Sequence, residues 1–395
     1  MPARKLRIVL LLFACALARA AVVPAGARLE IRLKSKVASN ASKAKDPVEA
    51  ILIMPVASNG DIVVPAGVAV TGTVKSATPI AKQGDRASLE LDFSKLAGAP
   101  IAAKVVGVDN ARESVDDSGK ITGILASETL SARISAGVDK VTQKYAKLGD
   151  FLGTVASAVV KEPEPEIVYE PGVEMTLELT KPATITNAPA PQAVAAVTPE
   201  AKIFDFVNSQ PFQTTSTGGT PSDLTNLMFI GSEEQLSAAF QAAGWSPAAQ
   251  LNAQSGLEVF RAVAEMRGYK EAPMSVLLLD GQKPDVVFQK QNNTFAMRHH
   301  LRIWRRPGTF DGKPVWVCAA THDIGIDFSP EKRTFIHKID SEIDHERAKV
   351  VADLLLTGHV KALSLVARPS APRESSNATG DKLITDGAMA VLVLE

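Results

Sequence analysis

All six histidines of this chain fall between residues 299 and 359. Two of them, His299 and His300, are adjacent on a predicted strand, so their side chains point to opposite faces and cannot both bind one metal ion. His299 shares its face with apolar residues, which predicts a histidine satisfied within the core. Cys318 and His322 lie roughly 13 Å apart along a predicted strand, too far for two ligands that bond one ion at ~2 Å. The spacing therefore predicts no metal and no other cofactor.

A polar cluster is the stronger candidate for chemistry in this region. It combines a cationic strand face with acidic residues and a histidine at the ends of predicted elements: Arg298, His300, Arg302, Asp323, His337, Asp340 and Asp344. Guanidinium groups and helix N-termini both bind carboxylate or phosphate, so the cluster predicts either a buried ion network or an anion-binding pocket. Structural ion pairing is the favoured interpretation. We expect the cationic groups to lie near Asp340 or Asp344, at the start of the last helix.

Catalysis by this cluster would use His300 or His337 as an acid–base group beside Asp323 or Asp340. Such a mechanism also needs a nucleophile or a bound water molecule. The sequence contains no Gly-x-Ser-x-Gly elbow, phosphate loop, zincin helix or dinucleotide fingerprint. No catalytic residue is therefore predicted.

The second half of the chain groups its helices and strands in blocks, which predicts an α+β domain. Ser232 and Gln235 form a capping box that begins one helix. Two strand-like runs, 298–304 and 315–320, are joined by Pro-Gly and Asp-Gly turn signals. These runs are expected to pair as a hairpin.

A last helix is expected from about residue 341 to 357, and it carries a row of polar residues. His345, Lys349 and Asp353 recur at i, i+4 and i+8. Such a row is typical of a solvated helix face.

The first half of the chain repeats a short phrase, which predicts a mainly antiparallel β-domain over residues 21–185. Residues 26–33 and 172–179 align, and residues 67–74 form a looser copy. In each copy a glycine precedes alternating apolar and polar residues, so we expect a small barrel or sandwich. An Ala/Gly/Ser/Thr-rich segment, 118–160, predicts a helical insertion. The repeated sequence pattern resembles that of short β-domains of bacterial envelope and conjugation-type secretion components, which implies binding or scaffolding.

Two further segments complete the predicted domain plan. Residues 186–222 hold five prolines and six threonines and lack a sustained periodicity, which predicts a linker. The α+β domain is expected over residues 223–366. Residues 367–395 are expected to form a C-terminal tail with a short apolar strand.

The N-terminus has the pattern of a secretory signal peptide. Basic residues within 4–7 precede an apolar run at 8–17 and a small-x-small site at 18–20. Cleavage after Ala20 is predicted, and lipidation of Cys15 is the competing interpretation. No later stretch is long and apolar enough for a transmembrane helix, so the mature chain is expected to be soluble or peripheral to a membrane.

The charge balance excludes several partners. The formal net charge is zero, and it falls to −4 when the four cations of residues 1–20 are removed. A mildly acidic chain without a polybasic block is a poor ligand for nucleic acid or for a charged membrane surface. An envelope component or an anionic ligand is the partner that we expect.

The second half of the chain also resembles a known family. The motifs that carry the resemblance are Phe229-Ile230-Gly231-Ser232, Ala272-Pro273-Met274-Ser275, Phe288-Gln289-Lys290, Arg298-His299-His300-Leu301-Arg302-Ile303-Trp304, Pro314-Val315-Trp316-Val317 and His337-Lys338-Ile339-Asp340. In this order they are similar to the LssY C-terminal domain family over residues 223–366. That family takes its name from a proposed secretion component, and its activity is not established. In longer relatives the domain follows a membrane phosphatase domain, whose helices and motifs this sequence lacks.

Together these observations predict an exported, periplasmic or envelope-associated protein with a β-rich domain and an α+β domain of LssY type. The expected role is non-catalytic binding or scaffolding. The alternative is a hydrolase that acts on a phosphorylated or otherwise anionic envelope substrate through the Arg/His/Asp cluster.

Overall fold

The computed structural model describes residues 21–58, 61–82, 84–125, 166–186, 188–189, 194–247, 276–290, 297–329 and 334–395. The predicted signal peptide, its cleavage site and Cys15 lie outside these residues. So does most of the predicted helical insertion, from residue 126 onward.

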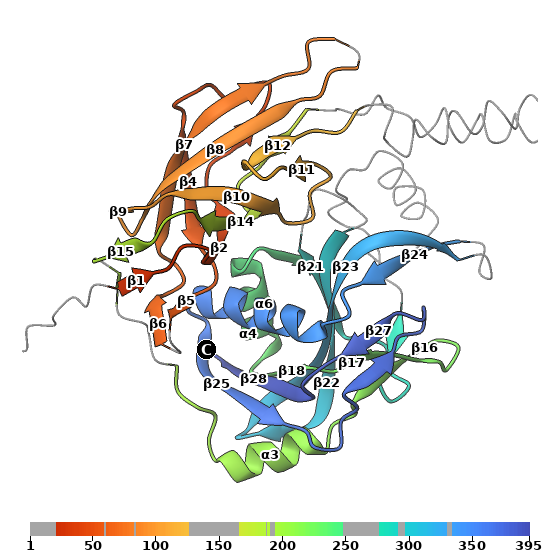
Figure 1. The fold of residues 1–395 in the computed structure, drawn as a ribbon. Coiled ribbons are helices and arrows are strands. Elements are labelled where there is room, and N and C mark those ends of the chain that lie inside the picture. The colour runs from red at the N-terminus through yellow and green to blue at the C-terminus, as the bar shows by residue number, and fades with distance from the viewer. Residues whose placement is uncertain are drawn as a thin grey trace, which may run out of the picture.

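The N-terminal half is built from short strands and forms a nearly closed, barrel-like sheet, termed the barrel below (Figure 1). Its strands are β1 (Ala21–Val23), β2 (Arg28–Leu33), β3 (Val37–Ala38), β4 (Pro47–Leu52), β5 (Val56–Ser58), β6 (Asp61–Val64), β7 (Ala69–Thr78), β8 (Ser88–Leu96), β9 (Ala99–Pro100), β10 (Ala103–Val108), β11 (Ser114–Val115), β12 (Lys120–Thr122), β13 (Val168–Tyr169), β14 (Glu174–Leu179) and β15 (Ala183–Ile185).

The main sheet of the barrel is antiparallel, in the order β10-β14-β2-β4-β7-β8-β12-β11, with β9 beside β8. The two closest copies of the repeated phrase are β2 and β14, and they pair directly with each other. Their alternate residues Leu29, Ile31, Met175 and Leu177 are buried in one core, as period-2 patterning predicts. β10 also packs against β8, which curls the sheet toward closure.

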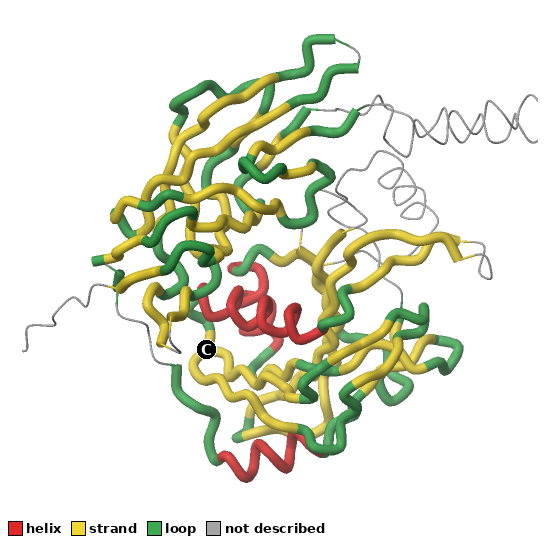
Figure 2. The backbone as a smooth tube through the Cα atoms, viewed as in Figure 1, coloured by secondary structure: helices red, strands yellow, loops and turns green. Residues whose placement is uncertain are grey.

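The C-terminal half contains a second, larger sheet with helices on both faces (Figure 2). Its elements are α3 (Glu200–Asn208), β16 (Gln213–Ser216), β17 (Pro221–Leu224), β18 (Leu227–Ile230), α4 (Glu233–Ala242), β19 (Trp245–Pro247), β20 (Leu277–Leu278), β21 (Val286–Lys290), β22 (Met297–Phe310), β23 (Lys313–Ser329), β24 (Thr334–Ile339), α6 (Ile343–Leu356), β25 (Val360–Ala367), β26 (Glu374–Ser376), β27 (Lys382–Ile384) and β28 (Ala388–Leu394).

This second sheet runs in the order β19-β21-β22-β23-β18-β28-β25, with β24 on β23. Side chains alternate between its faces, so Leu227 and Phe229 pack with α4 and α6, whereas Met228 and Ile230 pack on the opposite face with α3. Helix α6 lies between the sheet and the barrel (Figure 1). Residues of β22, β23 and α6 are thereby brought to the boundary between the two halves.

The predicted capping box and hairpin are both confirmed. The Ser232 side chain accepts a hydrogen bond from the backbone N–H of Gln235, and α4 begins there. β22 and β23 pair antiparallel around a two-residue turn at Asp311 and Gly312, which both have positive φ. Such a turn matches the twist of the two strands. The Pro-Gly signal at 307–308 lies instead at a shift of register between Arg306 and Thr309.

Three predicted segment assignments need correction. The start of the predicted helical insertion is strand β12, which pairs with β8. The predicted linker, 186–222, contains α3, β16 and β17. The predicted tail, 367–395, supplies β28, which lies inside the second sheet between β18 and β25.

The physical reason is the same for α3 and β28. Ile203 and Val207 lie one helical turn apart and are buried against the second sheet. Val391 and Leu392 of β28 are fully buried on its two faces. Burial against a distant part of the chain thus gave structure to the predicted linker, and it placed the short apolar strand expected in the tail inside the second sheet.

Among the described helices, none combines the length and the apolar character that crossing a membrane requires.

Candidate functional site at the domain interface

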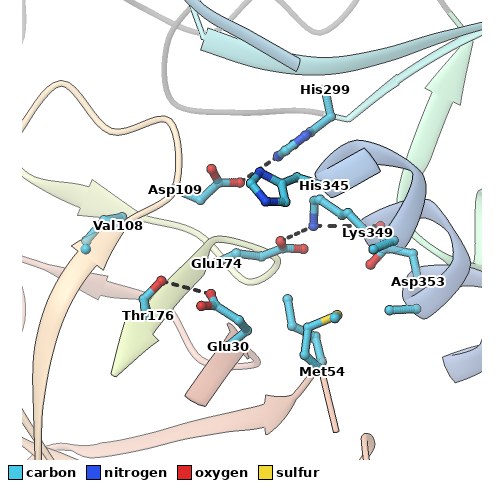
Figure 3. Close-up of a pocket in the computed structure, with 14 residues that line it drawn as sticks. Glu30, Met54, Val108, Asp109, Glu174, Thr176, His299, His345, Lys349 and Asp353 are labelled. Atoms are coloured by element: carbon cyan, nitrogen blue, oxygen red, sulfur yellow. Dashed lines mark hydrogen bonds and ion pairs between the residues drawn. The ribbon is translucent and has the colours of Figure 1, made fainter. Parts of the chain in front are cut away.

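Five charged side chains from both halves form one network at the interface, termed the interface network. Arg32 Nη2 of β2 lies 2.5 Å from Asp353 Oδ1 of α6 and 2.8 Å from Glu174 Oε1 of β14. Lys290 Nζ of β21 lies 2.7 Å from Glu174 Oε1 and 2.6 Å from Asp353 Oδ2. Lys349 of α6 contacts Glu174 Oε2, and Figure 3 shows this pair. Two carboxylates therefore bind three cations, and three of the salt bridges cross the interface: Arg32–Asp353, Lys290–Glu174 and Lys349–Glu174.

Burial makes these ion pairs interdependent. Glu174 is 7 % exposed and Asp353 is 1 % exposed. Burial alone would raise the pKa of Glu174, but the attraction of Lys349, Lys290 and Arg32 outweighs it and holds that pKa well below the ordinary value. Burial and the repulsion of Lys349 lower the pKa of Lys290. The carboxylates are thus fixed as anions by the cations that surround them.

A second polar group lies beside the interface network and centres on two histidines. His299 of β22 and His322 of β23 are directly opposite each other, with stacked rings whose centroids are 4.1 Å apart. His299 Nδ1 lies 2.6 Å from Glu346 Oε2 of α6, and its Nε2 lies 2.8 Å from Asp109 Oδ2 of the barrel. His322 Nε2 lies 2.8 Å from Asn110 Oδ1. Both imidazoles therefore bridge the two halves of the chain.

The charges around the two rings differ. Burial alone would lower the pKa of His299, but the negative charges of Glu346 and Asp109 outweigh it and raise this pKa to about 9. At neutral pH both ring N–H groups of His299 donate to carboxylates. Burial and the positive charge of His299 lower the pKa of His322. One ring is thus cationic and its stacked neighbour is neutral.

A cavity of about 450 Å³ adjoins both groups, and Figure 3 shows the side chains that face it. The barrel contributes the polar residues Glu30, Asp109, Glu174 and Thr176. The C-terminal half contributes His299, His345, Lys349 and Asp353. Apolar side chains of both halves complete the wall: Ile53, Met54, Val108, Ala348 and Ala352.

Glu30 is a carboxylate of the cavity that belongs neither to the interface network nor to the histidine group. Its Oε2 accepts a hydrogen bond from Thr176 Oγ1 at 2.8 Å. Burial raises its pKa, which the Thr176 hydrogen bond partly offsets. A hydrogen-bond donor that entered the cavity would stabilise the ionised form of this side chain.

Residues 207–389 match the family model described as LssY C-terminus. This match agrees with the predicted resemblance, and the part of the chain that it covers is termed the LssY domain below. The match begins within α3 and ends in β28, so the LssY domain is longer at both ends than the predicted 223–366. No curated protein matches the chain.

The family match divides the site between two parts of the chain. Lys290, His299, His322, Glu346, Lys349 and Asp353 belong to the LssY domain, whereas Glu30, Arg32, Asp109, Asn110 and Glu174 belong to the barrel. The site as a whole therefore exists only where the barrel docks onto the LssY domain.

The cluster predicted from the sequence is located elsewhere in the LssY domain and does not assemble as expected. His300 Nε2 lies 2.8 Å from Asp323 Oδ1, and Arg302 Nη1 lies 3.1 Å from Asp223 Oδ2. All four side chains are buried, on the face of the sheet opposite His299. The structure thus pairs Arg302 with Asp223, a residue that the sequence prediction did not include.

The remaining predicted members have different partners. Asp344 lies 3.0 Å from Arg347 of the same helix, and Asp340 accepts a hydrogen bond from the backbone N–H of Glu342. That these two aspartates meet the cationic strand face stays a prediction. Arg298 and His337 belong to β22 and β24, and their side chains lie outside the part of the chain that the structure describes.

One arrangement near His300 has the order of a hydrolytic triad. Thr321 Oγ1 lies 3.2 Å from His300 Nδ1, and His300 Nε2 contacts Asp323. A hydroxyl, an imidazole and a carboxylate in this order can act in nucleophilic catalysis when the hydroxyl reaches a substrate. Thr321 is 2 % exposed, so its hydroxyl faces the interior of the LssY domain.

The sequence prediction missed the residues of the interface network. Lys349 and Asp353 lie on the helix row that was predicted to be solvated, but against the barrel Asp353 is buried and Lys349 is half-buried. His345 of the same row is 75 % exposed, as predicted. Glu174 shares the polar phase of β14 with Thr176 and Glu178, so the alternation of this strand gave no signal that Glu174 is buried.

Proposed function

We propose that this chain is an exported, non-catalytic binding protein of the cell envelope whose barrel and LssY domain form one unit and bind a small ligand in the cavity between them. The observation that carries this proposal is the 450 Å³ cavity, which has walls from both halves. Its volume falls in the range of about 300–1,000 Å³ that is typical of small-molecule sites.

The chemistry of the cavity favours a ligand with an apolar body and an amine or other N–H donor at one end. Ile53, Met54 and Val108 offer an apolar wall. Glu30 offers a carboxylate at the cavity, whereas Asp109 is already bound to His299 and Lys349 to Glu174. An anionic ligand would have to compete with Glu174 for that ammonium group. A donor that binds Glu30 would instead offset the cost of burying a carboxylate.

Export is supported by the pattern of the first twenty residues. The first described strand, β1, begins at Ala21 and pairs with β15. Cleavage after Ala20 would leave this pairing intact.

The test measures thermal stability and calorimetric binding of the chain that starts at Ala21. The probes are n-hexylamine, spermidine and hexanoate. We expect hexylamine to raise Tm and to bind with 1:1 stoichiometry, and hexanoate to do neither. Met54→Trp places an indole in the cavity and is expected to abolish the response. The control Leu365→Trp adds the same group at an exposed position of β25, outside the cavity, and should leave the response unchanged.

Two results would overturn the proposal. One is a response to hexanoate but to neither amine, or an amine response that Met54→Trp preserves. The other is hydrolysis of p-nitrophenyl phosphate or p-nitrophenyl acetate by the wild type that disappears in His300→Ala, which would establish the hydrolase alternative.

A further inference from the structure

Three potential metal ligands from distant parts of the chain converge beside the cavity. Asp109 of the barrel, His299 of β22 and His322 of β23 each offer one ligand atom, and these atoms all lie within 4.8 Å of one another. The two imidazoles are held in place by direct pairing of their strands and by stacking of their rings. Neither ring can turn freely, so the separation of the two nitrogens is set by the sheet.

We propose that Asp109, His299 and His322 bind a divalent transition metal ion of the zinc class at the interface between the barrel and the LssY domain. Two imidazoles and one carboxylate are a common protein donor set for Zn²⁺ and for Fe²⁺. The inference goes beyond the proposed function, because the ion would bind these three side chains whether or not an organic ligand occupies the cavity.

Glu346 contacts the ring nitrogen of His299 that faces away from the proposed ion. Its Oε2 lies 2.6 Å from His299 Nδ1, which orients the ring and leaves Nε2 directed at Asp109. Carboxylates that hold the far nitrogen of a metal-binding histidine in this way recur in zinc sites and increase the basicity of the ligand. Glu346 is 3 % exposed, and its Oε1 has no hydrogen-bond partner within the part of the chain that the structure describes. A cation nearby would compensate for this buried charge.

To accept the ion, the three ligand atoms must move from separations of up to 4.8 Å to those of a coordinated ion. Bonds of ~2.0–2.1 Å in tetrahedral geometry place neighbouring ligand atoms about 3.3 Å apart. The 2.8 Å between Asp109 Oδ2 and His299 Nε2 is a hydrogen-bond distance, so the ion would displace the Nε2 proton to solvent and this pair would open by about half an ångström. Asp109 is 28 % exposed and lies just after β10, where its side chain has room to move.

The other shift concerns His322. Its Nε2 now contacts Asn110 Oδ1 at 2.8 Å, and a change of tautomer would turn that nitrogen into a ligand. Asp109 and His299 also line the cavity, so the fourth coordination position faces it and is available to water. An open position of this kind distinguishes the site from a closed structural zinc site.

The test uses the untagged chain from Ala21 to Glu395, freed of metal with EDTA and dialysed. Zn²⁺ alone is titrated by calorimetry, and Co²⁺ is added separately to record visible d–d absorption. We expect one ion per chain, the intense cobalt spectrum of a four-coordinate site, and a rise in Tm with Zn²⁺. Glu346→Gln should weaken Zn²⁺ binding by about 10–100-fold, and His322→Ala by more.

The controls separate a specific site from incidental binding by histidines. His345→Ala removes an exposed imidazole that lines the same cavity but lies outside the proposed ligand set, and it should leave affinity and spectrum unchanged. Asp109→Asn, on the partly exposed loop, should fold and lose the cobalt spectrum, so the test does not depend on a buried histidine variant. The proposal is overturned if neither ion binds at a 1:1 ratio, if His322→Ala and Asp109→Asn bind as the wild type does, or if His345→Ala abolishes binding.

The outcome is independent of the proposed function. Met54→Trp is expected to block hexylamine and to leave Zn²⁺ binding intact. His322→Ala is expected to have the opposite effect. A chain that does not bind Zn²⁺ could therefore still bind hexylamine in the cavity, and a chain that does not bind hexylamine could still bind Zn²⁺.

Discussion

Glu174→Gln should be among the most destabilising single substitutions in this protein, because it removes one of two carboxylates that bind one buried and two half-buried cations. The side chain keeps its size and loses its charge. Arg32, Lys290 and Lys349 would then share Asp353 alone, and the formal charge of the interface network would rise from +1 to +2. Removal of one partner of a buried ion pair costs about 3–5 kcal/mol. We expect the upper part of this range, since all three cations contact Glu174.

Urea unfolding of the full mature chain measures this cost, with Glu170→Gln as the matched control. Glu170 pairs with Lys36 at 2.6 Å in the same barrel, but both side chains are more than half exposed. The control should lose about 0–1 kcal/mol. A double variant, Glu174→Gln with Lys290→Met, removes one anion and one cation and should recover part of the loss. The reasoning is refuted if Glu174→Gln costs no more than Glu170→Gln, or if the double variant is less stable than the two single losses combined.

Further predictions concern pH, the Arg302 pair, the thiol and the N-terminus. The folded-state pKa values of Glu174 and Asp353 lie below their ordinary 4.5 and 3.8. The stabilisation from these two carboxylates is therefore complete above about pH 5 and is lost as the pH falls through the lowered values. The free energy of unfolding should fall less steeply with acid in Glu174→Gln than in the wild type. Arg302→Met leaves the charge of Asp223 buried without this partner and should cost about 3–5 kcal/mol of unfolding free energy. The control Lys382→Met, at an exposed ion pair, should cost about 0–1 kcal/mol. Equal losses would show that the Arg302 pair contributes nothing. Cys318 is fully buried and burial raises the pKa of its thiol, so the native chain should resist a thiol reagent that labels it in urea. Mass spectrometry of the exported chain should find Ala21 at the N-terminus, and a diacylglyceryl group on Cys15 would contradict cleavage after Ala20.

The sequence predicted local structure where short-range patterns decide it. Period-2 alternation identified β2 and β14, and the Ser232 capping box located the start of α4. The hairpin of β22 and β23 followed from its turn signals. These features depend on residues within about ten positions of each other, so one sequence is sufficient to indicate them.

The candidate site depends on contacts that no local pattern reports. Lys349 meets Glu174 across 175 positions of sequence, and Arg32 meets Asp353 across 321. The row of His345, Lys349 and Asp353 on α6 has the spacing of a solvated face, and the face would be solvated if the barrel were not docked on it. The pairing of Arg302 with Asp223 was missed for a related reason, because Asp223 lies 79 positions away on β17.

The chemistry of the interface explains why a cavity persists where the two halves meet. Apolar contact is non-directional, and two apolar faces would slide together until the space between them closed. Ion pairs with hydrogen-bond geometry form at one relative placement, because Arg32 and Lys290 must each reach both Glu174 and Asp353. We infer that the interface network contributes orientation more than net stability, since well-packed apolar residues in its place would stabilise the contact about as well. The same fixed placement brings Asp109 of the barrel within 2.8 Å of His299 in the LssY domain, so the ligand cavity and the proposed metal site both depend on it.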